Sequence, residues 1–144
     1  MKTLENNQQI NTITSQHMVM DFSMRRPKIL VVEDEPLNQK VARITLDMMG
    51  YDVVVAGNGY EALNAFDESY DFILMDIGLP DIDGMEVTRR IREKELSLNS
   101  HVFIIAATAS GKSFKEPCLE AGMDDFLMKP LFQEDLEAVL NKYR

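Results

Sequence analysis

Five polar residues follow apolar segments of this 144-residue sequence, at points where buried strands would end. Glu33 and Asp34 follow the run ILVV, and Asp76 follows FILM. Thr108 comes directly after FIIAA, and Lys129 comes directly after FLM. In an open parallel sheet the carboxyl ends of the strands share one edge, and ligands bind at that edge. The five side chains are therefore expected to converge on one site.

The chemistry that suits these side chains is phosphoryl transfer assisted by a divalent cation. Packed carboxylates repel one another unless a positive charge neutralises them. Mg²⁺ prefers such hard oxygen ligands and also accepts phosphate oxygens. Lys129 supplies a fixed positive charge and Thr108 a hydroxyl donor, so both can stabilise charge on a transferring phosphoryl group. Asp76 would be the nucleophile and would form an acyl phosphate.

Strands and helices that would position these residues alternate along the chain. Strands are expected at residues 28–32, 52–56, 71–75, 101–107 and 126–128, because each range contains a continuous apolar run typical of strands buried on both faces. Helical spacing of apolar residues predicts helices from Pro36 to before Gly50 and at 60–67, 85–95, 114–121 and 133–143. This alternation predicts an α/β fold with a parallel sheet, right-handed crossovers and helices on both faces.

Several helical patterns predict which side chains face the core. In the first helix Leu37, Val41, Ile44 and Met48 recur at helical spacing. In the third helix Val87 and Ile91 are expected to face inward. The basic residues of that helix are expected to form a solvated face; they are Arg89, Arg90, Arg92 and Lys94.

Three further residue groups have simple structural interpretations. Cys118, the only cysteine, is expected to be a small buried hydrophobe. Asp81 and Asp83 more plausibly close a turn than bind metal. Pro117 lies in the expected fourth helix, and because proline is poorly tolerated in helix interiors, that helix is expected to be short or to start late.

Composition excludes several classes of function. The net charge of −9 argues against direct nucleic-acid binding, which requires basic surface. A single cysteine permits no disulfide within the chain. No signal peptide and no apolar run near 18 residues are present, so we expect no membrane insertion and a cytoplasmic location.

Two segments are expected in the chain. Residues 1–27 are polar and are expected to form a weakly ordered arm, with residues 28–144 forming the folded domain. A short helix at 15–22 would place Met18, Val19 and Phe22 on one face. The methionines of the arm could dock on an apolar groove.

The motifs ILVVEDEPLNQ, DFILMDIGLPDIDG, FIIAATAS and CLEAGMDDFLMKPL resemble the response-regulator receiver domain, in combination and in order. They are most similar to receivers of hybrid histidine kinases and phosphorelays. The resemblance covers residues 28–143. It implies a flavodoxin-like (βα)5 three-layer sandwich whose five-stranded sheet has the order 2-1-3-4-5.

The resemblance also implies a role for each site residue. Asp76 is the phosphoacceptor, Asp34 binds Mg²⁺ directly, and Glu33 acts on the cation through water. The backbone carbonyl of Gly78 completes the protein ligands, and Lys129 pairs with a phosphate oxygen.

The resemblance implies features of three more residues, of which Thr108 and Phe126 would report on phosphorylation. Pro130 would follow a cis peptide bond, Thr108 would be the switch hydroxyl, and Phe126 would be the switch aromatic. Phosphorylation would remodel the face formed by the segments 114–121, 126–128 and 133–143. Because Gly78 has no side chain and Ser110 a short one, neither would position a hydrolytic water, so we expect slow self-dephosphorylation.

The leading interpretation is a signalling receiver, not a conventional enzyme, that catalyses its own aspartyl phosphorylation and dephosphorylation. The phosphoryl donor would be a histidine kinase or a histidine phosphotransfer protein, and the output would pass through a partner. Two alternatives remain open. A haloacid-dehalogenase-type aspartyl-phosphate hydrolase would need a second acid at the place of Gly78. A flavin-binding electron carrier would need a phosphate-cradling loop where Glu33, Asp34, Glu35 and Pro36 stand.

Overall fold

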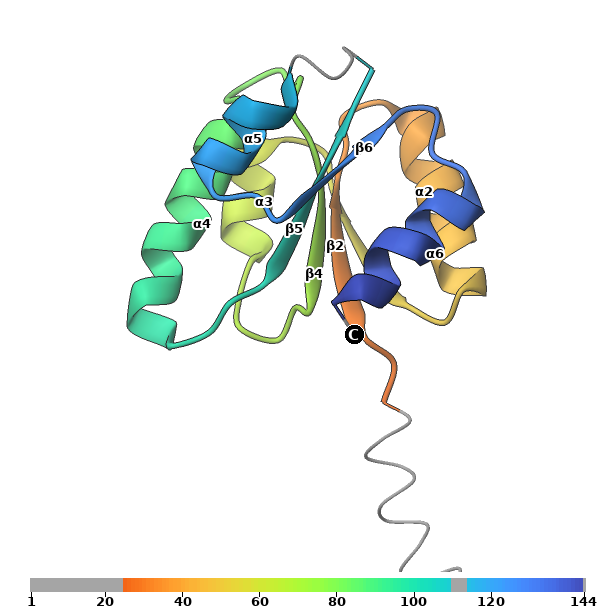
Figure 1. The fold of residues 1–144 in the computed structure, drawn as a ribbon, viewed down its shortest axis with the longest axis horizontal. Helices are drawn as coiled ribbons and strands as arrows, with labels where there is room; N and C mark the ends of the chain where they lie inside the picture. Colours follow the sequence, from red (N-terminus) through yellow and green to blue (C-terminus); the bar gives the residue numbers. More distant parts are fainter. Residues whose placement is uncertain (1–24, 110–113, 144) are drawn as a thin grey trace, which may run out of the picture.

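The structure is a computed structural model that describes residues 25–109 and 114–143 (Figure 1). The expected arm up to residue 24, its short helix at 15–22 and Ser110 therefore lie outside the described residues. Five strands form one parallel sheet: β2 (Lys28–Val32), β3 (Asp52–Ala56), β4 (Phe72–Asp76), β5 (Phe103–Thr108) and β6 (Asp125–Met128). Their order in the sheet is β3-β2-β4-β5-β6. In chain order this is 2-1-3-4-5, which confirms the expected fold class.

In the described part of the chain, four helices connect successive strands: α2 (Pro36–Met48), α3 (Gly59–Ala65), α4 (Gly84–Leu98) and α5 (Lys115–Ala121). A fifth, α6 (Gln133–Lys142), follows β6. Helices α2 and α6 cover one face of the sheet, and α3, α4 and α5 cover the other (Figure 1). The three layers follow from right-handed crossovers between parallel strands. Among the helices described, none combines the length and the apolar character that crossing a bilayer requires.

Apart from one polar residue at an end of each strand, the strand sequences are apolar, because both faces of the sheet are covered. Alternate residues of β2 enter different cores: Leu30 and Val32 pack beneath α3, α4 and α5, whereas Ile29 and Val31 pack beneath α2 and α6. The β4 and β5 strands alternate in the same way. Cys118 is fully buried in the first core, which confirms the structural interpretation of this cysteine.

The helix ends are fixed by side-chain caps and left-handed residues. Glu35 caps α2 by accepting a hydrogen bond from the Asn38 N–H at 2.9 Å, and Gly50 follows the helix with φ +97°. Asp83 caps α4 through the Glu86 N–H. Asp81 accepts hydrogen bonds from the Gly59 and Tyr60 N–H groups, both at 2.9 Å, and ties the turn to the start of α3. Turn closure by Asp81 and Asp83 is thus confirmed.

Helix α5 is short, as expected, and its proline is accommodated. The helix has seven residues and begins at Lys115, so Pro117 lies in its first turn. Backbone N–H groups of a first turn have no partner inside the helix, so proline loses no hydrogen bond there. Gly122 ends α5 in the left-handed region with φ +113°.

The apolar stripe of α2 faces solvent, although the helix itself forms where its spacing predicted. The exposed fractions are 64% for Leu37, 51% for Val41, 50% for Ile44 and 76% for Met48. Only Ala42 and Leu46 of this helix are buried. The stripe therefore is not a core contact, and an exposed apolar surface of this kind requires another explanation.

Arg92 is the exception to the expected solvated face of α4. Its guanidinium group is largely buried and forms ion pairs with Glu95 at 2.7 Å and Asp124 at 2.8 Å. It also donates to the Val102 and Gly122 carbonyls. The prediction of a solvated side chain was wrong for Arg92 because residues far along the chain supply its partners, while Arg89, Arg90 and Lys94 are exposed.

Candidate functional site

The five residues singled out by sequence lie together at the carboxyl edge of the sheet. Asp76 ends β4 and pairs with Ala107 of β5, and Thr108 ends β5 opposite Met128. The Lys129 N–H donates to the Thr108 carbonyl at 2.8 Å, which joins the ends of β5 and β6. The parallel register thus brings residues from four separate segments to one place.

Three carboxylates form the centre of the site. Glu33, Asp34 and Asp76 each place a ligand oxygen within 4.8 Å of the others. Glu33 and Asp76 are nearly buried, at 6% and 9% exposure, while Asp34 is exposed. Three hard oxygen ligands at one edge, one of them open to solvent, match the preference of Mg²⁺ for a few carboxylates and retained waters. The residues present therefore fit a magnesium ion.

Lys129 is the cation of this cluster. Its Nζ atom lies 2.7 Å from Oε1 of Glu33 and 3.4 Å from Oδ2 of Asp76. Burial alone would lower the pKa of Lys129, but its hydrogen bond to Glu33 and the charges of Asp76 and Glu33 outweigh burial and raise that pKa above its ordinary value. The ammonium group therefore stays charged beside Asp76.

The backbone around Asp76 is also shaped for the site. The Gly78 N–H donates to Oδ1 of Asp76 at 3.1 Å, and this hydrogen bond orients the carboxylate. The Lys129–Pro130 peptide bond is cis. Gly84 packs tightly behind the site, because a Cβ atom there would lie 2.5 Å from the Asp76 carbonyl oxygen.

Gly84 is a site residue that sequence reasoning missed. The Asp-Gly pair at the end of the acidic turn was its only signal, and that pair indicates a turn without revealing what the glycine approaches. Any side chain at this position would push α4 away from Asp76. The glycine therefore serves to position the phosphoacceptor candidate.

Of the two residues proposed to report on phosphorylation, Thr108 lines the cleft over the acids and Phe126 lies further along β6. The Thr108 side chain is buried, with 2% exposure. Phe126 pairs with Ala106 in the sheet and is partly buried against the core beneath α5. A cleft of about 490 Å³ opens over the acids and is lined by Gly78, Thr108 and Phe114, among others.

A second hollow, of about 270 Å³, adjoins the site on the side of α2. Asp76, Lys129 and Pro130 line it together with Leu37 and Val41 of α2. The exposed apolar stripe of α2 is thus continuous with the acidic site.

We compared the chain with a family model, with known protein sequences and with solved structures. The family model described as the response regulator receiver domain matches residues 29–141. The hybrid signal transduction histidine kinase I of Dictyostelium discoideum is 42% identical over 121 residues, which are 79% of this chain and 7% of the kinase. The chain therefore spans a small part of the length of that relative.

Two solved structures show the same fold. The receiver domain of sensor histidine kinase PA1611 from Pseudomonas aeruginosa PAO1 is 40% identical, with a TM-score of 0.73 over 82% of this chain and 97% of that one. It was crystallised with a magnesium ion coordinated in its active-site cleft. The other match is a co-crystal of the Saccharomyces cerevisiae histidine phosphotransfer protein Ypd1 and the receiver domain of Ssk1. It is 29% identical, with a TM-score of 0.76 over 82% of this chain and 88% of that one.

Proposed function

Because the chain belongs to the response regulator receiver domain family, we propose that Asp76 accepts a phosphoryl group from the phosphohistidine of a kinase or phosphotransfer protein. The single observation that carries this proposal is the contact of Lys129 with both Asp76 and Glu33 inside a cluster of three acids. A nearly buried carboxylate beside a fixed cation and an oxygen-rich cation site suits attack on phosphorus.

The transfer consists of one displacement at phosphorus. An Oδ atom of Asp76 forms a bond to phosphorus while the bond from phosphorus to the donor imidazole nitrogen breaks. With a proton from solvent on its other ring nitrogen, the donor imidazole leaves as a neutral ring, and Asp76 becomes an acyl phosphate. Lys129 balances the negative charge of the transferring group, and the Gly78 N–H holds the carboxylate in place.

Magnesium fits the oxygen atoms of Glu33, Asp34 and Asp76, and we propose that these residues, with the Gly78 carbonyl, hold it. When bound, the cation would neutralise charge on the phosphoryl oxygens. The related Pseudomonas receiver, which has magnesium in its cleft, supports this part of the proposal.

The readout is proposed to pass through Thr108 and Phe126. A phosphoryl group on Asp76 would offer new acceptors to the Thr108 hydroxyl, and movement of Thr108 would free space for the Phe126 ring. The face formed by α5, β6 and α6 would then change shape. This face has partly exposed apolar residues, Leu119, Met128 and Phe132, that a partner could read.

The phosphoryl donor is proposed to dock on the exposed stripe of α2. Leu37 and Val41 of this stripe line the same hollow as Asp76 and Lys129. A helical partner that covers Leu37 and Val41 would place its histidine over Asp76. The yeast co-crystal, in which a receiver domain accompanies a histidine phosphotransfer protein, supports a partner of this class.

The two alternative functions have less support. Gly78 stands where a dehalogenase-type hydrolase would need its second acid, and the loop after β2 carries Glu33, Asp34 and Glu35 where a flavin phosphate would bind. Family membership and the magnesium-compatible acids favour the receiver over both.

The direct experiment is labelling by a small phosphoramidate donor with and without Mg²⁺. We expect labelling of the wild-type chain only with Mg²⁺, and none of Asp76→Asn. Asp135→Asn, which alters an exposed acid of α6, is the matched control and should label normally. Labelling that persists in Asp76→Asn would remove Asp76 from its proposed role.

A further inference from the structure

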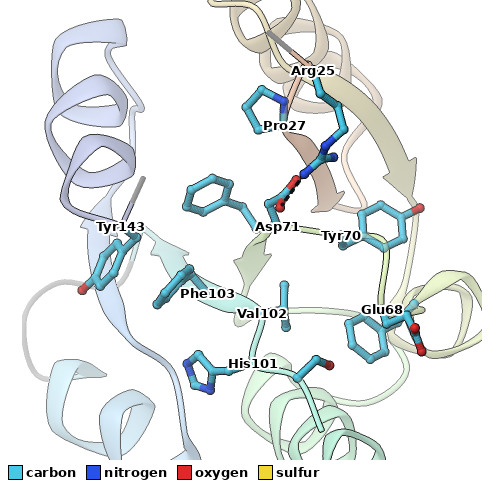
Figure 2. Close-up of a pocket in the computed structure, with 12 residues that line it drawn as sticks. Arg25, Pro27, Glu68, Tyr70, Asp71, His101, Val102, Phe103 and Tyr143 are labelled. Atoms are coloured by element: carbon cyan, nitrogen blue, oxygen red, sulfur yellow. Dashed lines mark hydrogen bonds and ion pairs between the residues drawn. The ribbon is translucent and has the colours of Figure 1, made fainter. Parts of the chain in front are cut away.

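A separate pocket, distinct from the cleft and the hollow beside Asp76, opens at the amino edge of the sheet, at the opposite end of the strands. Its volume is about 460 Å³ (Figure 2). Segments that precede β2, β4 and β5 form its walls, including Pro27, Asp71 and Val102. Nothing in the proposed phosphoryl chemistry uses this pocket.

The pocket lining combines aromatic rings, including Phe103 and Tyr143, with polar side chains such as Glu68 and His101. Phe72 and Val102 contribute to the lining, with 2% and 3% exposure. Phe103 stacks on Tyr143 with a centroid distance of 4.7 Å and lies 6.1 Å from Phe72. Such an array favours an additional apolar ring, because aromatic pairs gain from offset and edge-to-face contacts.

The chain itself enters the domain at the rim of this pocket. Arg25 lines the pocket and faces Asp71, with 3.5 Å between Nη2 and Oδ1 (Figure 2). The Lys28 N–H donates to the other Asp71 oxygen at 2.8 Å, which fixes the direction of entry. The 24 residues before Arg25 must therefore continue from this rim.

The segment just before Arg25 has the composition of a docking element. It carries Met18, Val19, Met20, Phe22 and Met24, with few charges among them. Phe22 precedes Arg25 by three residues, so even a fully extended chain places it no more than about 10 Å away. Methionine side chains adapt readily to irregular apolar surfaces.

We propose that residues 18–24 of this chain dock in the amino-edge pocket, with the Phe22 ring as the apolar anchor. A segment tethered at the rim has an effective concentration in the millimolar range, which an untethered partner or a second copy would have to exceed. The proposal does not rest on the proposed function. It assigns the arm to the end of the domain away from Asp76, so docking leaves the phosphoryl site and the α2 stripe open.

The test uses the full chain and nuclear magnetic resonance. In the wild type we expect nuclear Overhauser contacts between the Phe22 ring and the Val102 methyl groups. Phe22→Ala should remove these contacts and shift the amide signals of Val102, Phe103 and Tyr143. Ile10→Ala is the matched control, because it shortens an apolar residue outside the proposed segment and should leave those signals unchanged.

Three results would overturn the proposal. One is the absence of contacts between Phe22 and Val102. Another is a set of pocket amide signals that does not respond to Phe22→Ala. The third is contacts that arise only between differently labelled copies in a mixed sample, which would assign the pocket to a second chain. Phe22→Ala should also leave labelling by the small phosphodonor unchanged, because the pocket lies at the opposite edge of the sheet from Asp76.

Discussion

The Lys129 ammonium group lies 2.7 Å from Oε1 of Glu33, closer than its 3.4 Å distance to Oδ2 of Asp76. The lysine therefore bridges two acids that are both nearly buried. Glu33 holds the lysine beside Asp76, the phosphoacceptor candidate. The role expected for Glu33 at the cation and the role expected for Lys129 at the phosphate are therefore coupled. Removing the lysine would leave two carboxylates without their counter-charge.

We expect Lys129→Met to lower the free energy of unfolding by about 1–3 kcal/mol in the absence of Mg²⁺, the cost of leaving a buried polar partner unsatisfied. Added Mg²⁺ should recover part of this loss. Urea unfolding with and without Mg²⁺ measures both effects. Lys142→Met is the control, because its ion pair with Asp125 is on the exposed side of α6 and its loss should not depend on Mg²⁺. An Mg²⁺-independent loss in Lys129→Met would contradict the proposed coupling.

The convergence of the acids and Lys129 could be predicted from the sequence because its determinants are local. Each strand is a short apolar run, and parallel strands must end at a shared edge, so Glu33, Asp76 and Lys129 were expected to converge before any contact was known. The order of the sheet and the residue roles came from the resemblance to receivers. The closer pairing of Lys129 with Glu33 could not be predicted, because it depends on the path of the chain after β6.

Other features depend on contacts between distant segments and escaped prediction. The α2 stripe has the spacing of a core face, yet Ala42 and Leu46 are the buried residues of this helix. Helical spacing predicts that Arg92 is a surface residue. The structure pairs it with Asp124, 32 positions later, which spacing within one helix could not reveal. Periodicity specifies an apolar face but not the surface that the face will meet.

Magnesium is expected to stabilise the folded chain through its carboxylates. Binding to the native state alone adds about 2.7 kcal/mol when the cation is at one hundred times its dissociation constant. The wild type should show a rise in melting temperature with Mg²⁺, and Asp34→Asn should lose most of it. Asp135→Asn should behave as the wild type. An equal magnesium response in Asp34→Asn would exclude Asp34 as a ligand.

Gly78 is expected to make the acyl phosphate long-lived. A Cβ atom at this position would contact only Oδ1 of Asp76, at 4.0 Å, so a longer side chain can be accommodated. We predict that Gly78→Gln speeds dephosphorylation severalfold, because its amide can hold a water in line with the phosphorus. Loss of label after removal of the donor measures the rate, with Gly78→Ala as the control. A wild-type lifetime of seconds would contradict the expectation of slow hydrolysis.

Asp125 should contribute to the acid stability of the β6–α6 unit. Burial works to raise the pKa of Asp125, but hydrogen bonds from the Lys142 ammonium, the Phe126 N–H and the Tyr143 hydroxyl outweigh burial and lower it below 3.8. A carboxyl with a lowered pKa stabilises the fold above its unfolded pKa, and this contribution is lost as pH falls through the folded value. Asp125→Asn should therefore lower the urea midpoint at pH 7, with the difference from wild type shrinking below about pH 4. A difference that stays constant down to pH 3 would show that the charge of Asp125 is not responsible.

The α2 stripe gives the sharpest test of partner docking. Ile44 is 50% exposed, so Ile44→Asp should change the free energy of unfolding by no more than about 0.5 kcal/mol. If a histidine phosphotransfer protein covers this stripe, the charge would be buried against an apolar partner, and transfer from that protein should slow about tenfold, equivalent to about 1.4 kcal/mol. Labelling by the small phosphodonor should not change, because that donor needs no docking surface.

Leu96→Asp is the matched control, since Leu96 is 86% exposed on α4, across the sheet from α2. Equal slowing by Ile44→Asp and Leu96→Asp would show that α2 has no special part in the encounter.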